Sequence, residues 1–512
     1  MTIRPQTIRP QTIRPTTLRA ACMASLLLSG CAVGPDFQRP PAPAVQGYTP
    51  APLPASTAAA NDRFGGAQHF DTDKDIQGEW WQLLHSQPLD ALVAQALKAN
   101  PTLAAAQAAL RQAQENVAAQ RGQYFPQVSA GLSASRNLTP LAALSPASAS
   151  GSPYYSLITP ELNVSFVPDV FGANRRTVES LEAQAEDQRF QLEATYLTLT
   201  SNVVAAAVQE ASLRGQIAAN QEIVKEETAL LDILRHQLEL GQVAGSDVAA
   251  QEAALAQAQQ VLPPLQKQLA LQRDLLTELA GRFPSQEVEE HFDLAGLQLP
   301  LDLPLSLPGK LIEQRPDVRA AEANMHSASA QIGVAVAARL PQITLTGNLG
   351  NSANSAANLF TPGTNFWTIA GGVTTPVFEF GTLLHKQRAA QAAFDQAAAQ
   401  YQSTVLTAFQ NVADSLRALQ SDADALNAAV ASERAAARSL AIVQRQLDLG
   451  QVAYLLLLNA ENVYQQTRIA LVLAEANRLA DTAALFQALG GGWWNRSDVA
   501  SAGTHLEADA SK

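Results

Sequence analysis

The sequence predicts a mainly helical chain built from a duplicated unit, each copy carrying two membrane strands and long coiled-coil-like helices. The first observation is a repeat: residues 238–243 return, with one acidic side chain exchanged for another, as residues 447–452. The glycine of a Phe-Gly pair lies 69 residues before the motif glycine in both copies, and another glycine lies 40 residues after it. Such fixed spacings indicate one supersecondary unit written twice. The other two observations are strand periodicity and a long stretch without proline, each present in both copies.

The N-terminus, residues 1–30, has the plan of a secretion signal. Four arginines in its first 19 residues precede an apolar run at 20–28, which is too short to span a bilayer. The sequence Leu-Ser-Gly-Cys at 28–31 is similar to a lipoprotein cleavage site. We therefore expect Cys31 to become the lipid-modified (palmitate-bearing) first residue; an ordinary signal peptide with an incidental cysteine is the alternative. Ala32 in place of aspartate resembles outer-membrane lipoproteins.

Charge and motifs exclude several classes of protein. A net charge of −12 argues against nucleic acid as a partner. No later segment has 18 uncharged apolar residues, so any membrane crossing would be made by strands. There is neither a G-x-S-x-G turn nor a phosphate-binding loop, and the seven histidines form no spaced cluster with cysteine or acids. We expect no enzymatic activity, no metal and no cofactor besides the lipid.

Residues 31–72 are predicted to form a lipid-anchored tether, because they are rich in Pro and Ala without a period. The first repeat, residues 73–281, opens with helical sequence that breaks at Asn100-Pro101 and resumes to about Gly122.

Strand texture begins at Pro126. Leu162, Val164 and Phe166 alternate with polar residues, which indicates strands with one apolar and one polar face. A soluble hairpin with one wet face is the alternative, but the long Ser/Pro loop between the strands favours a membrane pair. The predicted strands are 127–138 with 156–167 in the first copy and 342–350 with 366–380 in the second.

Residues 173–240 contain no proline and one glycine, and predict a helix about 100 Å long. Its apolar residues fall on two adjacent stripes, the first interrupted at Asn220 and Glu227. One stripe would make a coiled-coil seam, whereas two suit a helix with a neighbour on each side. The first stripe contains Leu213, Ile217, Val224, Leu231, Leu234 and Leu238, and the second Ile223, Leu230, Ile233 and Leu240.

The helix should turn at its motif glycine and return from an N-cap at Ser246, giving a helical hairpin over 173–280 that Pro263-Pro264 must break or kink. The second repeat, 311–490, contains the matching hairpin, 381–489. Between the repeats lies an equatorial linker, 282–310, and the C-terminal tail, 491–512, is expected to be disordered from about Trp493.

Four strands per chain cannot close a barrel, and open edges are not tolerated in lipid. Two chains would give a plugged barrel of eight strands, and three give twelve. The sequence therefore predicts a homotrimer in which a membrane β-barrel continues into a helical tube reaching into the periplasm.

At this point the chain resembles the outer membrane factor (TolC/OprM-like) family, in its lipid-anchored NodT-type branch. The residues that carry the resemblance are Cys-Ala-Val-Gly-Pro-Asp-Phe at 31–37, Trp80-Trp81 with Leu-Asp-Ala-Leu at 89–92, the run 311–323, and the paired Leu-Gly-Gln-Val turns. The likeness covers about residues 31–490. It implies a trimer with a twelve-stranded β-barrel, a twelve-helix periplasmic α-barrel and an equatorial belt. It also implies docking to a periplasmic adaptor and to an inner-membrane pump, which we expect to be of the RND type.

The resemblance places the two interhelical turns at the far end of the tube, where they meet the adaptor. These docking tips are Gly241, Gln242, Val243, Ala244, Gly245 and Ser246, with Gly450, Gln451, Val452, Ala453 and Tyr454. Helix termination by glycine is the simpler interpretation of both turns, and the two are compatible. Asp247 matches a family position that closes the aperture, but its counterpart lies in a run of four leucines. The candidate gate residues are Asp247, Leu455, Leu456 and Asn459, where leucine side chains could gate by dewetting or simply pack between helices.

Four prolines, Pro126, Pro168, Pro341 and Pro376, are expected to set the bends between strands and helices, or only to end the strands. Arg315 and Asp317 are expected to cap the helix that follows Pro316.

We conclude from the sequence that the chain is a passive outer-membrane exit duct of an efflux pump for small toxic compounds. Two alternatives stay open at this stage: the outer-membrane component of a type I protein secretion system, and a non-conducting lipoprotein that spans the periplasm as a spacer.

Overall fold

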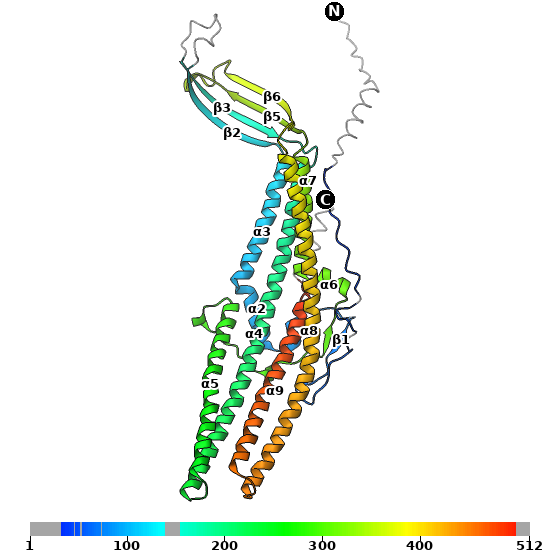
Figure 1. Cartoon of the computed structure of the whole chain (residues 1–512). Coiled ribbons are helices and arrows are strands. Elements are labelled where there is room, and N and C mark those ends of the chain that lie inside the picture. The colour runs from blue at the N-terminus through cyan, green and yellow to red at the C-terminus, as the bar shows by residue number, and fades with distance from the viewer. Residues whose placement is uncertain (1–31, 46, 52–53, 73, 139–153, 498–512) are drawn as a thin grey trace, which may run out of the picture. The chain divides into compact units, whose positions relative to one another are not determined.

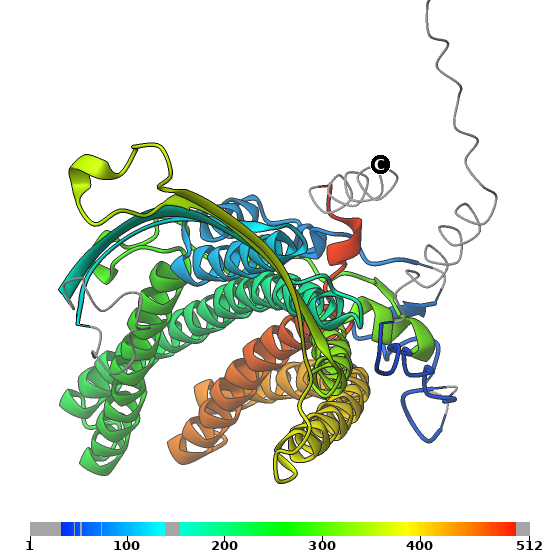
Figure 2. The same cartoon turned by 90° about the horizontal axis from the view of Figure 1, so that it is seen from above.

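Alternating side chains produce the four-stranded sheet shown in Figure 1. The computed structural model describes residues 32–45, 47–51, 54–72, 74–138 and 154–497. The strands are β2 (Gln127–Leu138), β3 (Tyr154–Phe166), β5 (Gln342–Asn351) and β6 (Asn365–Thr374). They run antiparallel in the order β2-β3-β5-β6, so each predicted pair is a hairpin and the two hairpins join through β3 and β5. Seen from above, the sheet is curved (Figure 2).

The pairing register sorts the side chains of the sheet onto two faces. One face carries the apolar residues: Val128, Leu132, Leu162, Val164, Leu345, Leu349, Trp367, Ile369 and Val373. The other is mostly polar, with Ser129 and Ser133 in β2 and Asn163 and Asn348 in the central strands. The apolar face is exposed in the single chain, where Leu132 has 74% and Ile369 81% of its surface accessible.

One predicted strand boundary is wrong. The strand expected over 366–380 ends at Thr374, and residues 375–379 are in neither strand nor helix. Its partner β5 begins at Gln342, opposite Thr374, so no residue remains to pair with the following segment. Pro376 also lacks the N–H that a ladder would need.

The helices reproduce the duplication in their lengths. Helices α4 (Ala173–Glu239) and α8 (Thr382–Asp448) both have 67 residues, and the returning helices α5 (Gly245–Leu279) and α9 (Tyr454–Ala488) both have 35. Each hairpin is preceded by its own strand pair and by a shorter helix, α3 (Pro101–Arg121) or α7 (Pro316–Ala337). The expected mainly helical, duplicated chain with four long strands is therefore confirmed. Among the helices of the described residues, none is long and apolar enough to cross a membrane.

The chain divides into two compact units. The first contains the four-stranded sheet and is made of the chain up to Arg39, Arg111–Glu186 and Ala323–Ala399. The second is made of Pro40–Leu110, Asp187–Glu322 and the chain from Gln400 onward. Helices α3, α4, α7 and α8 contribute residues to both.

The two adjacent apolar stripes on α4 differ in solvent exposure within the second unit. On the first, Leu213, Leu231 and Leu234 are buried. On the second, Ile233 and Leu240 are more than half exposed. The second copy repeats the contrast, with Val443 buried and Ile442 and Leu449 exposed. The contrast is not complete, since Ile223 of the second stripe is buried and Leu238 of the first is 40% exposed, so it is the tip end of the second stripe that stays exposed in the single chain.

Helix α5 differs from the prediction at two places. It begins at Gly245 after an N-cap at Ala244, so Ser246 is not the cap residue. It also continues through Pro263 and Pro264, which were expected to break or kink it. Both prolines are solvent-exposed, so water can satisfy the carbonyl groups that lose their intrahelical partners.

The second unit also contains a small parallel sheet of β1 (His69–Asp71) and β4 (Asp302–Pro304), which joins the predicted tether to the predicted linker. The remaining helices there are α2 (Gln87–Ala99) and α6 (Pro308–Gln314), with short 3-10 turns at Trp80–Leu84, Pro284–Gln286, Leu294–Gly296 and Trp493–Asn495. In the first unit such turns lie at Gly122–Tyr124 and Ala356–Asn358.

The tether is not a free linker where the structure describes it. Arg478 of α9, fully buried, donates to the Thr57 hydroxyl and the Gly66 carbonyl at 3.1 and 2.7 Å. Gln68 donates to Thr482 at 2.9 Å. These contacts pack residues 57–68 against α9, which a Pro- and Ala-rich composition does not predict.

The first residues of the predicted tail are also packed, contrary to the expected disorder. Trp493 stacks edge-on against Phe190, and Arg496 donates to the Glu193 carboxylate at 2.8 Å, its guanidinium 3.8 Å from the centre of the Tyr196 ring. An aromatic and cationic anchor on α4 therefore holds residues 493–496; the rest of the tail, from residue 498, lies outside the described residues.

Candidate functional site

The two interhelical turns have the same backbone. Gly241 and Gly450 adopt left-handed conformations, with φ of 73° and 68°. In the first turn the N–H of Gln242 bonds the carbonyl of Gln237 at 2.9 Å and that of Gly241 bonds Leu238 at 2.9 Å. Gln451 and Gly450 form the same pair of bonds in the second turn, at 2.9 and 2.8 Å. This is the Schellman termination, in which glycine accepts a conformation that costs other residues energy.

Asp247 caps the start of α5. Its carboxylate accepts the backbone N–H of Ala244 at 3.2 Å, and its own N–H bonds the carbonyl of Ala244 at 3.0 Å. A carboxylate in the first turn of a helix also interacts favourably with the helix dipole. The residue predicted as part of a gate thus has a structural role within its own chain.

The two turns of one chain rest on a common apolar cluster. Its buried members are Leu231, Leu234, Val248, Val443, Tyr454, Leu457 and Leu458, drawn from α4, α5, α8 and α9. Val243 and Val452, one from each turn, pack against it. The tip residues of the two repeats are therefore brought together at one end of the second unit.

The cluster divides the four consecutive leucines of α9. Leu457 and Leu458 are buried in it, whereas Leu455 and Leu456 are 65% and 44% exposed. Asn459 is exposed as well. The three predicted gate residues of the second repeat are thus on the outside of the chain.

A buried polar network crosses the apolar cluster, and sequence reasoning missed it. Glu227 of α4, only 3% exposed, accepts hydrogen bonds from the Gln251 side chain at 2.5 Å and from Gln465 at 2.7 Å. Gln251, fully buried on α5, also donates to the Glu227 carbonyl at 2.9 Å and accepts from the Tyr454 hydroxyl. The signal was visible in the sequence as the acidic interruption of the first stripe.

An acidic groove lies beside this network. It has a volume of about 560 Å³ and is lined by residues of α4, α8 and α9, among them Leu230, Ile233, Leu440 and Tyr464. Burial, and then the charges of Glu227 and Glu226, raise the pKa of Glu461 to about 8. One carboxylate oxygen of Glu461 is buried without a hydrogen-bond partner within the described residues. At pH 7 the raised pKa favours the protonated, neutral form of this side chain.

A second partly buried acid, Asp422, lies on α8 near Arg478 of α9, the arginine that holds the tether. Burial, and then Asp481, raise the pKa of Asp422 to about 7, while the neighbouring Arg478 opposes the shift.

The four predicted bend prolines lie between regular elements in the first unit. Pro126 and Pro341 each stand directly before a strand, and Pro168 and Pro376 follow the strands β3 and β6.

Arg315 donates to Asp317 at 3.0 and 2.7 Å and to the Ala488 carbonyl at 2.8 Å, and the Asp317 carboxylate accepts the N–H of Val318. Asp317 thus accepts an N–H in the first turn of α7, as predicted, whereas the Arg315 side chain bonds the last residue of α9 instead of capping the helix after Pro316.

Cys31 and the signal residues lie outside the described residues, but the chain directly after Cys31 is firmly held. Arg176, 4% exposed, donates to the carbonyls of Val33 at 3.1 Å and Gly34 at 3.4 Å and to the Asp36 carboxylate at 2.7 Å. The Phe37 ring stacks on His326 with centroids 4.4 Å apart. A single arginine of α4 thus fixes the segment that follows the predicted acylation site.

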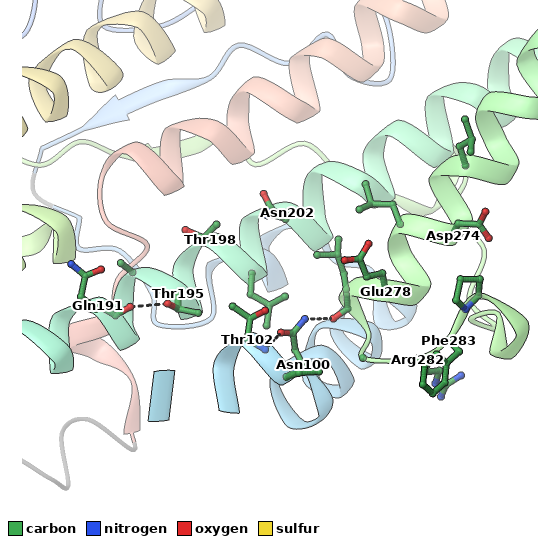
Figure 3. Close-up of a pocket in the computed structure, with 18 residues that line it drawn as sticks. Asn100, Thr102, Gln191, Thr195, Thr198, Asn202, Asp274, Glu278, Arg282 and Phe283 are labelled. Atoms are coloured by element: carbon green, nitrogen blue, oxygen red, sulfur yellow. Dashed lines mark hydrogen bonds between the residues drawn. The ribbon is translucent and has the colours of Figure 1, made fainter. Parts of the chain in front are cut away.

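A groove of about 980 Å³ lies at the junction of α3, α4 and α5 (Figure 3). Figure 3 shows Thr195 bonded to the Gln191 carbonyl and Asn100 bonded to the chain at Leu279. Leu271 and Phe283 line the groove and are 57% and 75% exposed. Its lining contains no His, Cys, Ser or Lys. Across the described residues, no group of three or more His, Cys, Asp or Glu could hold a metal ion.

Comparison with known proteins assigns this architecture. The family model described as "Outer membrane efflux protein" matches residues 92–282 and 307–491, one segment in each repeat. The chain belongs to the outer membrane efflux protein family. The family expected from residues 31–37 and 311–323 is confirmed, and with it an outer-membrane efflux channel rather than an enzyme family.

Curated relatives match nearly end to end. The probable efflux pump outer membrane protein TtgC of Pseudomonas putida is 28% identical over 487 residues, covering 95% of this chain and 97% of the relative. Outer membrane protein OprJ of Pseudomonas aeruginosa is 29% identical, covering 93% and 95%. The pyoverdine export outer membrane protein OpmQ of Pseudomonas putida is 29% identical, covering 81% and 88%.

Solved structures share the fold. The outer-membrane channel OprN superposes with a TM-score of 0.80 at 25% identity, covering 90% of this chain and all of that one. The Campylobacter jejuni CmeC outer membrane channel gives a TM-score of 0.82 at 22% identity, covering 93% and 98%. The subtype with a lipid anchor stays a prediction, as do the individual roles of the tip and gate residues.

Proposed function

We propose that three copies of this chain form the passive outer-membrane exit duct of a tripartite efflux pump. The observation that carries the proposal is the four-stranded sheet, which has an apolar and a polar face and two open edges, β2 and β6. A sheet with open edges is not stable in lipid, so the strands must continue into further copies. Three copies supply twelve strands, enough to leave a lumen wider than side chains can fill.

The exposed tip ends of the second stripes of α4 and α8 support the same assembly. Ile233, Leu240, Ile442 and Leu449 are each more than half exposed in the single chain. A closed ring of helices would bury them against the next chain, giving twelve helices for α4, α5, α8 and α9 of three chains. This ring is the periplasmic part of the duct.

The relatives are named as components of pumps that handle toluene, antibiotics or pyoverdine. By analogy we propose small toxic compounds as cargo, driven by an inner-membrane pump of the RND type through a periplasmic adaptor. We propose that the two Schellman turns are the adaptor-docking tips, since their glycines leave the backbone open to close approach. The duct itself contributes no energy and no catalytic chemistry.

We also propose that Cys31 carries the lipid anchor, palmitate included. The clamp of Arg176 on residues 33–36 would hold the acylated end at the side of the first unit. Growth with labelled palmitate should label the wild-type protein and leave Cys31→Ser unlabelled. Equal labelling of both would contradict the anchor.

The exposed pair Leu455 and Leu456 is our candidate for the aperture, closing it by dewetting when three copies meet. Leu456→Ser should raise the conductance of the isolated trimer, and Leu457→Ser is the buried control, which should instead destabilise the tip. Unchanged conductance in a Leu456→Ser trimer would refute the apolar gate.

The duct is tested by native mass spectrometry of the purified protein and single-channel recording in a planar bilayer. A trimer that conducts ions, even in brief openings, is the expected result. A monomer or dimer without conductance would leave a structural spacer as the better explanation.

A further inference from the structure

A short loop of the N-terminal segment is docked on α8 and α9 of the second unit. This loop, residues 57–68, is named the clasp loop here. The N–H of Thr57 bonds the Gln68 carbonyl at 2.9 Å, and the N–H of Gln68 bonds the Thr57 hydroxyl at 3.0 Å, so the loop closes on itself. Arg434 of α8 donates to the Asn61 carbonyl at 2.5 Å. The clasp loop is thus a closed element that a few specific groups attach to the helices.

Arg478 of α9 holds the clasp loop with only one of its three guanidinium nitrogens. Its Nη2 donates to Thr57 and Gly66, whereas Nε and Nη1 are buried without a hydrogen-bond partner among the described residues. Asp422 of α8 has the complementary deficit, since its Oδ2 is buried without a partner in the same part of the chain. The charge of each group acts on the pKa of the other. A guanidinium and a carboxylate form strong paired bonds, so two groups that could satisfy each other are held apart.

Asp422 is engaged with a second acid instead. Its side chain shares a hydrogen bond with Asp481 of α9. Two ionised carboxylates have no proton to donate, so this bond requires one of the pair to be protonated. Burial, and then the bond to Asp481, raise the pKa of Asp422 to about 7. While the proton stays, Asp422 attracts Arg478 only weakly, and the guanidinium remains on the clasp loop.

Another acid pair joins the clasp loop to α9 directly. The side chain of Glu475, three residues before Arg478, shares a hydrogen bond with Asp62 of the loop. Burial, and then the charge of Asp62, raise the pKa of Glu475 to about 7, while Arg63 opposes the shift. The pair is therefore an attachment when it holds a proton and a repulsion when both acids are ionised.

We propose that docking of the clasp loop is controlled by protons: the loop is held while Asp422–Asp481 and Glu475–Asp62 each share one, and it is released when both protons pass to solvent. On release, ionised Asp422 draws the unpaired edge of the Arg478 guanidinium away from the loop, and the second pair repels. All of these groups belong to one chain. The proton-controlled contact is thus separate from the assembly of the duct.

The direction of the pH dependence follows from the raised pKa values. In the released loop, Asp422 and Glu475 return to ordinary values of about 4, whereas in the docked loop both lie at about 7. The contribution of the protons to docking is complete below about pH 4 and is lost as pH rises to 7, and above 7 it changes no further. The other charged groups at this contact, Arg63, Arg434 and Arg478, remain cationic over the whole range.

Asp422→Asn and Glu475→Gln, singly and together in the full-length protein, test the proposal. Each amide can donate the hydrogen bond that the shared proton supplies, and neither amide titrates. The double variant should therefore keep the clasp loop docked at every pH. Asp424→Asn is the matched control, because Asp424 is an exposed acid on α8 two residues beyond Asp422.

Hydrogen–deuterium exchange of the peptide that contains residues 57–68 is measured at pH 4.5, 6, 8 and 9. Wild type is compared with the double variant at each pH, so that intrinsic exchange rates cancel. We expect wild-type exchange, relative to the double variant, to rise between pH 4.5 and 8 and to stay level from 8 to 9. Since both acids are partly exposed, we expect roughly tenfold per pair. Each single variant should remove the share of its own pair, and Asp424→Asn should behave as wild type.

Three results would overturn the proposal. A constant ratio of wild type to double variant would show that protons do not control docking. A loss of the pH dependence in Asp424→Asn would assign it to the general charge of α8. Rapid exchange of the loop in the double variant at every pH would show that the acids hold the loop in their ionised form. None of these results depends on whether the protein forms a trimer or conducts ions, so the duct is tested separately.

Discussion

Replacement of Glu461 by Gln should remove a pH dependence of the stability of the helical tips. In the wild-type chain, burial and then the charges of Glu227 and Glu226 raise the pKa of Glu461 from 4.5 to about 8. The folded tip therefore keeps the proton up to pH 8, whereas the unfolded chain loses it near pH 4.5. The stabilising contribution is complete below about pH 4.5 and is lost as pH rises to 8.

The size of the effect follows from the same shift. One pKa unit corresponds to about 1.4 kcal/mol, so the upper limit is about 5 kcal/mol. Glu461 is only partly buried, and solvent screening reduces this to roughly 2 kcal/mol. Glutamine has nearly the same shape and no titrating proton, so Glu461→Gln should lose this contribution to the pH dependence and fill the same space in the groove.

Hydrogen–deuterium exchange of the tip peptides around residues 226–233 and 454–465 is the assay. Wild type and variant are compared at pH 5 and at pH 9, so that intrinsic exchange rates cancel at each pH. Wild-type tips should lose protection relative to the variant between the two values, by roughly 30-fold for 2 kcal/mol. Glu252→Gln is the control, because Glu252 is half exposed and paired with Arg235.

Two results would refute the reasoning. If wild type and Glu461→Gln keep the same relative protection at both pH values, the carboxyl does not titrate in the folded tip. If Glu252→Gln changes the pH dependence as much as Glu461→Gln does, the effect belongs to the general charge of the tip rather than to the buried groove.

Three further predictions concern stability. Gly241→Val should destabilise the first turn by about 1–2 kcal/mol because valine resists the left-handed conformation, seen as faster proteolysis at the tip, with Gly245→Ala as the tolerated control. Leu457→Ala should cost about 2–5 kcal/mol, since the side chain is fully buried; a thermal midpoint equal to that of the exposed-site control Leu455→Ala would contradict it. Glu193→Ala should cost about 3–5 kcal/mol because it removes one partner of an ion pair whose two side chains are 9% and 7% exposed, and an unchanged urea midpoint would show that the C-terminal anchor is dispensable.

The parts of the fold that sequence could predict are those under repeated backbone constraint. Gly241 and Gly450 mark turns because the left-handed conformation selects glycine, and Leu162, Val164 and Phe166 mark a strand because its two faces meet different solvents. Both signals occur twice at fixed spacing, so the prediction for one copy was supported by the other copy. The details of the trimeric assembly, such as the twelve-helix barrel, came from the family resemblance, because the periodicity of one chain does not predict them.

The parts that sequence could not predict depend on contacts between distant segments. Composition alone makes residues 57–68 a linker, and only the position of Arg478 in α9 shows that they are packed. The same holds for Trp493 and Arg496, whose partners on α4 lie some 300 residues earlier. At the tip, Glu227 was visible as an interruption, but its partners Gln251 and Gln465 come from two other helices.

The identical Schellman backbones of the two turns carry different chemistry. The first continues into Ser246 and Asp247, whose carboxylate caps α5, and the second into the exposed Leu455 and Leu456. In a threefold assembly, the polar tips of the first repeat and the apolar tips of the second repeat would alternate around the ring. Identical partner molecules could therefore bind all the tips in the same way only by recognising the main chain, which is the same in both turns. If they recognise side chains instead, partners at the two kinds of tip must bind the duct with different affinities.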